Sequence, residues 1–346
     1  MLKAQRRGFS VQATPWLLLA GLALGGCGDG SDDGGTQPAK FDYPKDGELR
    51  MNQLQSNGSH NSYHVETPGM TIDALKYSHA MLDVQLAQQG VRQFELDTRW
   101  DADKGEFVVY HLPVIDTKSN CERFRDCLAL LAKWSKGHPA HQPIFVQIEP
   151  KDGLPADAEP YFASLEAEIL AEWPRSSIVT PDDVRGSASS LREAIVTAGW
   201  PTLGQARGKI LFFVDEAGPW REAYTHGGKD LDGRLLFASS TPGAAYEATY
   251  VLNDATSADI PARVKEGFIV RTRADSDNVE PFAGDTSKRD AAFASGAQLV
   301  STDYPAPVQG VNYLVEVPGG TPSRCNPLVA PSGCVANDIE DPKFIE

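Results

Sequence analysis

Four short stretches of the 346-residue sequence carry side chains that could do chemistry. His60 is followed directly by Asn61, which sets an imidazole beside an amide oxygen in a loop-forming stretch rich in Asn, Gly and Ser. Glu95 and Asp97 are two residues apart, so on a strand both carboxylates point to the same face. A third carboxylate, Glu149, completes with them and Asn61 an all-oxygen ligand set, which suits a hard cation, calcium before magnesium, better than zinc.

His60 and His111 are the two histidines expected beside that cation site. Imidazoles in such a place suit general acid–base catalysis on a phosphodiester. The simpler alternative is that the carboxylates form salt bridges with Arg92 or Arg99 and that His111 packs in the core. The convergence of six polar residues at strand ends favours the functional interpretation. The other histidines are expected to be surface or packing residues: His64, His79, His138, His141 and His226.

Basic side chains supply candidate substrate contacts. Lys151 follows the third carboxylate at a two-residue spacing, and Arg271 and Arg273 share one face of a later strand. We predict that Lys151 and Arg271 bind substrate, because both stand near strand ends. The alternative is a structural pairing of the two arginines with Asp275 or Asp303.

The candidate residues follow apolar runs, so strands should position them. Such runs occur at 51–54, 91–96, 107–110, 144–148, 210–214, 235–238, 267–270 and 299–301. Helical patterns lie between them, at 71–89, 127–135, 158–173, 189–198 and 287–294. This alternation predicts an α/β fold with a parallel sheet, a (β/α)8 TIM-type barrel, whose site lies at the C-terminal ends of the strands. An irregular strand order or a short extra hairpin, turning at 101–105, is compatible with the pattern.

The first 26 residues have the order of a secretory signal: a basic start, an apolar core too short to span a bilayer, and small residues before a cysteine. The Leu-Gly-Gly-Cys ending resembles the lipobox of bacterial lipoproteins, which implies cleavage before Cys27 and a lipid on its sulfur. We therefore expect an exported lipoprotein, anchored to a membrane on the periplasmic or extracellular side. Residues 27–40 should be a flexible tether, 41–316 the catalytic barrel, and 317–346 a C-terminal tail closed by a disulfide.

The four remaining cysteines form two close pairs, Cys121 with Cys127 and Cys325 with Cys334. In an exported protein such pairs predict two disulfides. A zinc site is the alternative for four cysteines, but neither pair has the two-residue spacing that zinc sites favour.

The composition is acidic, with 32 Lys and Arg against 47 Asp and Glu and a formal net charge of −15. Such a chain has no electrostatic footprint for nucleic acid and should be repelled by anionic lipid surfaces at long range. We therefore expect a monomer that has no nucleic-acid partner and reaches a membrane through its lipid rather than through a basic patch.

Four stretches resemble the catalytic half of the calcium-dependent phosphoinositide-specific phospholipases C, especially their bacterial branch. They are Ser-His-Asn-Ser-Tyr at 59–63, Gly-Val-Arg-Gln-Phe-Glu-Leu-Asp at 90–97, Val-Tyr-His-Leu-Pro at 109–113 and Ile-Glu-Pro-Lys-Asp at 148–152. The likeness is strong from about residue 51 to residue 152 and thin afterwards.

The resemblance implies roles for the candidate residues in cleaving an inositol phospholipid. The calcium ligands would be Asn61, Glu95, Asp97 and Glu149. The nucleophile would be the inositol 2-hydroxyl of the substrate. His60 would stabilise charge on the transferring phosphoryl group, and His111 would protonate the leaving diacylglycerol oxygen.

Two other functions fit parts of the pattern. Glycerophosphodiester phosphodiesterases share a Glu-x-Asp, a second histidine and a Glu-x-Lys on the same barrel, and would act on water-soluble diesters. The intact Ser-His-Asn at 59–61 favours the phospholipase, since the amide beside the histidine is a phospholipase C feature. A surface lipoprotein that binds inositol or sugar ligands without turnover is the alternative from another class.

Overall fold

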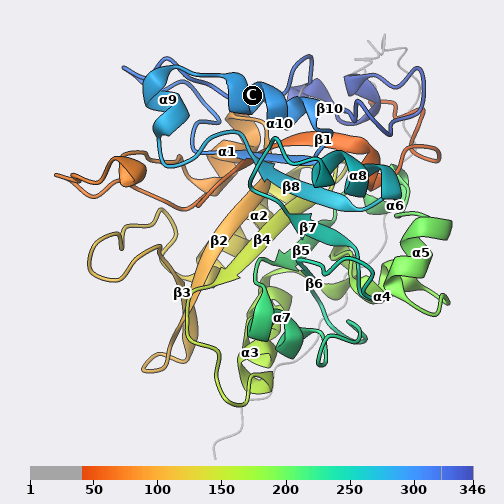
Figure 1. Ribbon diagram of the computed structural model, residues 1–346, viewed down its shortest axis with the longest axis horizontal. Coiled ribbons are helices and arrows are strands. Elements are labelled where there is room, and N and C mark those ends of the chain that lie inside the picture. The colour runs from red at the N-terminus through yellow and green to blue at the C-terminus, as the bar shows by residue number, and fades with distance from the viewer. Residues whose placement is uncertain (1–40, 321, 346) are drawn as a thin grey trace, which may run out of the picture. The chain divides into compact units, whose positions relative to one another are not determined.

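Within the residues that the structure describes, 41–320 and 322–345, eight parallel strands form the centre of a computed structural model (Figure 1). They are β1 (Leu54–Ser59), β2 (Val91–Asp101), β4 (Ile144–Pro150), β5 (Ile210–Val214), β6 (Phe237–Ala238), β7 (Thr249–Val251), β8 (Ile269–Arg273) and β9 (Leu299–Thr302). They pair in the order β6-β5-β4-β2-β1-β9-β8-β7, and a parallel bridge between Ser239 and Thr249 joins the two ends of that order. The predicted (β/α)8 barrel is therefore confirmed, with a regular strand order.

Helices follow most strands and cover the barrel. They are α1 (Leu82–Gln88), α2 (Phe124–Gly137), α3 (Glu159–Glu172), α4 (Pro181–Arg185), α5 (Leu191–Thr197), α6 (Leu203–Ala206), α7 (Gly218–Tyr224), α8 (Asp259–Glu266), α9 (Val279–Ala283) and α10 (Ser287–Ala294). Short 3-10 turns are η1 (Met51–Gln53), η2 (Asp73–Leu75), η3 (Arg175–Ser177), η4 (Ala336–Asp338) and η5 (Pro342–Phe344). On α2 the apolar face of Leu128, Leu131 and Trp134 is buried, as a helix against a barrel requires. None of the helices in the described part of the chain has the length and apolar character needed to cross a bilayer.

The first strand and the helix after it differ from the sequence prediction. The apolar run at 51–54 forms η1, and β1 begins only at Leu54, so the strand ends directly before His60. The helix predicted over 71–89 shrinks to η2 and α1, because tertiary partners bind backbone groups of η2 and of the segment that follows it. Asn278 Nδ2 donates to the Asp73 carbonyl at 2.6 Å, and the His79 N–H donates to the His64 carbonyl at 2.9 Å.

The extra hairpin allowed for in the sequence is present. β2 is 11 residues long; its last residues extend beyond the pairing with β4, and the chain turns back into β3 (Glu106–Val109), which pairs with them antiparallel. Val109 thereby returns to the level of Thr98, and Thr98 pairs with Pro150 at the C-terminal end of β4. The residues after β3 consequently re-enter the barrel at the end where the site was expected.

Gly58 permits the close approach of β1 and β2. A Cβ on this residue would lie 2.1 Å from Gln93 Oε1, so any larger residue would have to displace the Gln93 side chain. The pairing register of the two strands shifts between Asn57 and Gly58, which marks a local irregularity just before the loop that carries His60.

The C-terminal segment is part of the barrel unit and not a separate tail. Residues 41–346 form a single compact unit, and β10 (Ser323–Cys325) pairs antiparallel with the first half of β1. Both predicted disulfides, Cys121–Cys127 and Cys325–Cys334, are present. The predicted signal peptide, Cys27 and the tether up to residue 40 lie outside the described residues.

A buried ion pair fastens this C-terminal segment to the base of the barrel. Arg92 on β2 donates to Glu340 Oε2 through Nε at 2.9 Å and Nη2 at 2.6 Å, and the Gln142 N–H donates to the other carboxylate oxygen at 2.7 Å. Neither side chain of the ion pair is exposed, and the Arg92 guanidinium stacks over Trp134. Removing one member would therefore leave an uncompensated buried charge.

We expect Glu340→Ala to lower the free energy of unfolding by about 3–5 kcal/mol, because it leaves the Arg92 charge buried without its partner. Urea unfolding at pH 7 measures this change. The matched control is Glu316→Ala, which removes an exposed carboxylate and should alter stability by about 0.5 kcal/mol or less. Equal effects of the two substitutions would show that the ion pair does not hold the C-terminal segment in place.

Candidate active site

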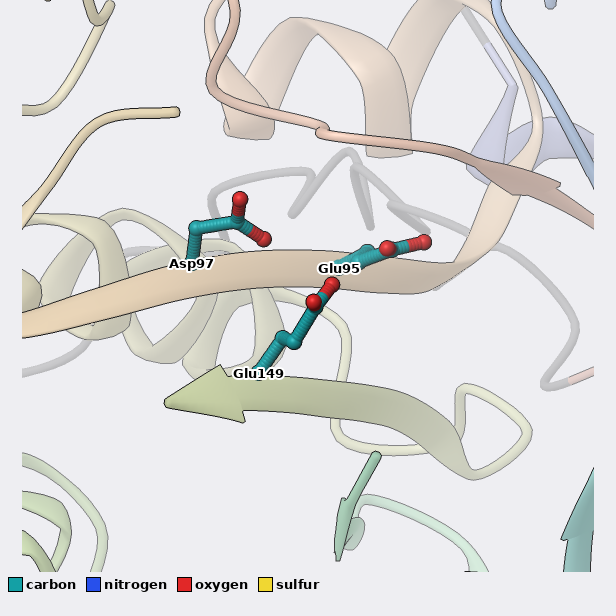
Figure 2. A group of neighbouring side chains, drawn as sticks. All are labelled: Glu95, Asp97 and Glu149. Atoms are coloured by element: carbon teal, nitrogen blue, oxygen red, sulfur yellow. The ribbon is translucent and has the colours of Figure 1, made fainter. Parts of the chain in front are cut away.

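Three carboxylates meet at the C-terminal ends of two neighbouring strands. Glu95 and Asp97 project from the same face of β2, and Asp97 is the direct pairing partner of Glu149 on β4. Each offers an oxygen, and these oxygens all lie within 4.8 Å of one another. Figure 2 shows Glu149 reaching from β4 toward the two carboxylates that rise from β2. The parallel register of β2 and β4 thus brings the three carboxylates together, as the sequence predicted.

The crowding of these carboxylates changes their proton affinity. Burial raises the pKa of Asp97 well above its usual value, the Lys151 ammonium opposes that rise, and the charges of Glu149 and Glu95 add to it. Both Asp97 oxygens are buried without a well-aligned hydrogen bond from any described residue. Their polar neighbours are Lys151, at 3.2 Å from Oδ2, and the Tyr63 hydroxyl. The cluster is short of positive charge.

The two basic residues predicted to bind substrate both contact the carboxylates. Lys151 Nζ pairs with Glu149 Oε1 as well as with Asp97. Arg271 is 1% exposed and donates through Nη2 to Glu95 Oε2. In this arrangement Arg271 is closed to a substrate, while Lys151 remains at the surface of the site.

The alternative pairing of the carboxylates with Arg92 or Arg99 does not occur. Arg92 pairs with Glu340 at the opposite end of its strand. Arg99 donates to two backbone carbonyls, that of Lys151 at 2.9 Å and that of His111 at 2.8 Å. By binding both, Arg99 holds the backbone of His111 beside the end of β4.

The loop after β1 lies directly against Glu95. The Ser62 N–H donates to the Glu95 carbonyl at 3.0 Å, and Ser62 Oγ accepts from the Glu95 N–H at 2.8 Å. Asn61 adopts a left-handed φ of 43°, which Asn tolerates better than most residues. Its amide nitrogen donates to the Tyr77 hydroxyl at 3.3 Å, and its oxygen accepts from the Tyr63 hydroxyl at 3.4 Å, on the side where Tyr63 neighbours Asp97.

These residues fit a hard cation. The three carboxylates from β2 and β4 form an oxygen-only donor group, which hard divalent cations prefer. The Asn61 amide oxygen, in the loop after β1, contacts the Tyr63 hydroxyl that neighbours Asp97. The raised pKa of Asp97 supports the same conclusion, since a divalent ion would compensate the charge that burial and Glu149 now oppose.

His60 is held in one protonation state by its neighbours. Its Nδ1 lies 2.7 Å from Asp303 Oδ1, and its Nε2 lies 3.1 Å from Arg273 Nη1. Because a guanidinium can only donate, Nε2 must accept, and the ring proton therefore sits on Nδ1 and is donated to Asp303. Burial, together with the Arg273 charge, lowers the pKa of His60 despite the nearby carboxylates of Asp303 and Glu95. Neutral His60 thus presents a basic nitrogen 3.9 Å from Glu95 Oε1.

His111 shares one carboxylate with a second histidine. Its Nδ1 lies 3.0 Å from Asp116 Oδ2, while His64 Nε2 contacts both Asp116 oxygens at 2.9 and 3.0 Å. Burial would raise the pKa of Asp116, but the bonds to His111 and His64 outweigh it and lower that pKa to about 2. Asp116 is therefore an anion that orients both imidazoles. Among the described residues, no hydrogen-bond partner is assigned to His111 Nε2.

Sequence reasoning missed several of these partners. His64, predicted to be a surface or packing residue, is fully buried and stacks on Tyr77, but its bond to Asp116 was not foreseen. Asp116 stands five residues after His111, a spacing that a tight loop could have suggested. Asp215 directly follows β5, so the rule that predicted the other carboxylates from their positions after apolar runs could also have found it. Burial first, and then Glu95 and Glu149, raise the pKa of Asp215 to about 7.

Comparison with known proteins gives a family and a set of similar folds. A family model described as phosphoinositide phospholipase C, Ca2+-dependent, matches residues 49–110 and 103–327. None of the curated protein sequences matches the chain.

Two solved structures illustrate the similarity of fold. The Ca2+-dependent phosphatidylinositol-specific phospholipase C of Streptomyces antibioticus has a TM-score of 0.57 and 20% identity, over 74% of this chain and 95% of that one. The calcium-dependent phosphoinositol-specific phospholipase C of a Gram-negative Pseudomonas species has a TM-score of 0.57 and 18% identity, over 82% of this chain and 98% of the other. At such identities the likeness shows a shared fold.

The Asp116 anion should make stability depend on pH. Its pKa in the folded protein, about 2, lies below the ordinary value of 3.8, so the stabilisation is complete above about pH 4 and is lost as the pH falls toward 2. We expect Asp116→Asn to lower the free energy of unfolding by about 2 kcal/mol at pH 7, and by progressively less below pH 4. Urea unfolding between pH 7 and pH 3 measures both effects.

The matched control for this series is Asp103→Asn, since Asp103 is an exposed carboxylate in the turn between β2 and β3. Its effect on stability should be small at every pH. An Asp116→Asn effect that stays constant down to pH 3 would contradict the assignment of Asp116 as a charge stabilised by the two histidines.

Proposed function

This chain belongs to the Ca2+-dependent phosphoinositide phospholipase C family, and from that premise we propose that it cleaves the phosphodiester of phosphatidylinositol or a close relative. The products would be diacylglycerol and a cyclic inositol phosphate that can be hydrolysed later. The observation that supports this reaction best is the meeting, at one end of the barrel, of an oxygen-only cation site with two histidines that are each oriented by a carboxylate. That combination suits in-line displacement at phosphorus with proton transfer on both sides.

His60 is suited to the attacking side. Its neutral ring has the proton on Nδ1, held by Asp303, and Nε2 accepts from Arg273. Once Arg273 turns to the phosphoryl group, Nε2 could accept the proton of the inositol 2-hydroxyl as that oxygen attacks phosphorus. Arg273 then provides the positive charge beside the phosphoryl group that the sequence comparison had given to His60.

His111 is suited to the leaving side. Asp116 accepts from Nδ1 and orients the ring, so that Nε2 of a protonated His111 could donate to the diacylglycerol oxygen as the phosphorus–oxygen bond breaks. A calcium ion held by Asn61, Glu95, Asp97 and Glu149 would supply charge that offsets the growing negative charge on the phosphoryl oxygens and acidifies the attacking hydroxyl.

An exposed apolar surface beside the site favours a lipid over a water-soluble diester. We call it the apolar rim; it consists of Ile72, Leu112, Val114, Ile115, Val279 and Phe282. Val114 is 95% exposed at the tip of the loop that joins His111 to Asp116, and its φ of 69° is rare for a β-branched residue. Such an outlier next to a catalytic histidine suggests a functional reason for the side chain.

The segments of the apolar rim are joined to one another. A bridge between His64 and Ser119 links the loop after β1 to the loop after β3. Asn278 binds the Asp73 carbonyl and so links α9 to the loop after β1. In Figure 1 these loops and α9 extend to the same side of the barrel. We further propose an exported enzyme anchored to a membrane by a lipid on Cys27, on the basis of the signal-like start of the sequence.

The test is product release from phosphatidylinositol vesicles by residues 28–346, with calcium and with a chelator. Release of diacylglycerol and cyclic inositol phosphate that is lost on chelation would support the proposal. Cleavage of glycerophosphoinositol alone would point to a glycerophosphodiester phosphodiesterase. The absence of turnover on both substrates would favour a binding protein. His111→Ala is the control for contaminating activity, and it should lower turnover by about 10² or more.

The apolar rim gives a second prediction. Changing Val114 and Ile115 together to Ser should lower activity on vesicles about tenfold or more, because each apolar side chain buried in lipid contributes about 1.5 kcal/mol or more. Turnover of a short-chain phosphatidylinositol below its micelle concentration should stay within about twofold, since no interface is involved. Equal losses on the two substrates would mean that the substitutions disturb His111 rather than membrane contact.

A further inference from the structure

Lys151 occupies the oxygens that a metal ion would need. Its Nζ contacts Glu149 Oε1 and lies 3.2 Å from Asp97 Oδ2, and both carboxylates belong to the candidate cation set. Calcium binds carboxylate oxygens at about 2.3–2.6 Å. An ammonium and a calcium ion on the same oxygens would repel each other strongly in this buried place. The lysine must therefore move when the metal binds.

Of the two cations in the cluster, Lys151 is the one free to move. Arg271 is 1% exposed, and besides Glu95 its guanidinium donates to Asn253 Oδ1 and, at 3.1 Å, to Ser301 Oγ. The Lys151 side chain is 21% exposed and has only carboxylate partners. Its backbone is fixed by the Thr98 carbonyl and by Arg99, so only the flexible side chain need swing.

The charge balance of the cluster also favours release of the Lys151 ammonium when a divalent ion binds. Glu95, Asp97 and Glu149 carry three negative charges when ionised, and Arg271 offsets one of them. A divalent ion offsets the other two, which leaves the Lys151 charge in excess. The phosphodiester of the substrate carries one negative charge, and it would have to lie between His60 and His111. Arg99 holds the backbones of Lys151 and His111 side by side, so a released Lys151 ammonium starts next to that position.

We propose that Lys151 is an exchangeable counter-cation, which neutralises Asp97 and Glu149 before calcium binds, is displaced by the ion, and then pairs with the phosphodiester. This inference rests on the proposed function for the identity of the metal and of the anion. It has two measurable consequences: Lys151 weakens calcium binding in the absence of substrate, and it couples calcium binding to binding of a phosphate ester.

The first experiment is calorimetric titration of calcium into the chelator-treated protein, without lipid. Lys151→Met should lower the calcium Kd at least tenfold, because the competing ammonium is gone. Lys118→Met is the matched control: it removes an exposed lysine from the loop after β3, and should change the Kd by less than twofold. Lys151→Gln should behave as Lys151→Met does, and thermal unfolding in chelator checks that each variant is folded. An unchanged or higher Kd in both Lys151 variants would overturn the proposal.

The second experiment repeats the titration with saturating myo-inositol 1-phosphate as the anion probe. In the parent protein the probe should lower the calcium Kd at least threefold, since it accepts the displaced ammonium. In Lys151→Met this effect should disappear. Undiminished coupling in that variant would overturn the transfer of Lys151 to the phosphate. A parent that binds no calcium would refute the metal site itself, whereas a calcium-dependent lipase with an unchanged Kd in the Lys151 variants would refute this inference alone.

Discussion

The crowding of three carboxylates at adjoining strand ends is the constraint on which the rest of the site depends. Parallel pairing puts Asp97 opposite Glu149, and the pleat puts Glu95 on the same face as Asp97. Like charges held this close in a buried place need cations around them. Arg271 and Lys151 provide that charge within the protein, and both come from strand ends at the same mouth. The same shortage of positive charge suits the site to a divalent ion.

The two histidines serve opposite sides of this cluster and are oriented by carboxylates from different parts of the chain. Asp303 follows β9 and fixes the tautomer of His60, with Arg273 as its second partner. Asp116 is close in sequence to His111 and fixes it from within the same loop. Both imidazoles are partly exposed, with 19% of the His60 side chain and 23% of the His111 side chain accessible, and the loop of His111 carries the exposed Val114 at its tip. In the proposed reaction both imidazoles would reach the headgroup, and the apolar tip would contact the membrane.

The opposite end of the barrel is closed by the C-terminal segment. β10 adds to β1 at the end away from His60, and Glu340 reaches the buried Arg92 on the adjacent β2. These contacts fix the first two strands, which carry Glu95 and Asp97 and lead into the loop of His60, at the end opposite the candidate site. This end of the barrel is therefore closely packed, while the loops at the other end, around the candidate site, are free to shape substrate access.

The sequence alone was sufficient for the barrel and for the carboxylate cluster, because both follow from local periodicity. Apolar runs such as 210–214 mark buried parallel strands, and the spacing of Glu95 and Asp97 determines their common face whatever surrounds them. Short or weakly apolar elements such as β7 and β10 escaped prediction, because only their tertiary partners make them strands.

Tertiary structure alone decided what each charge pairs with. Arg271 and Lys151 were predicted to bind substrate, and the barrel also pairs them with Glu95, Asp97 and Glu149, which the sequence did not indicate. The partners of His60 lie more than 200 positions away in the chain. The physical reason is that a side chain's charge environment is set by distance in space, and closing a barrel brings together strand ends that no local pattern connects.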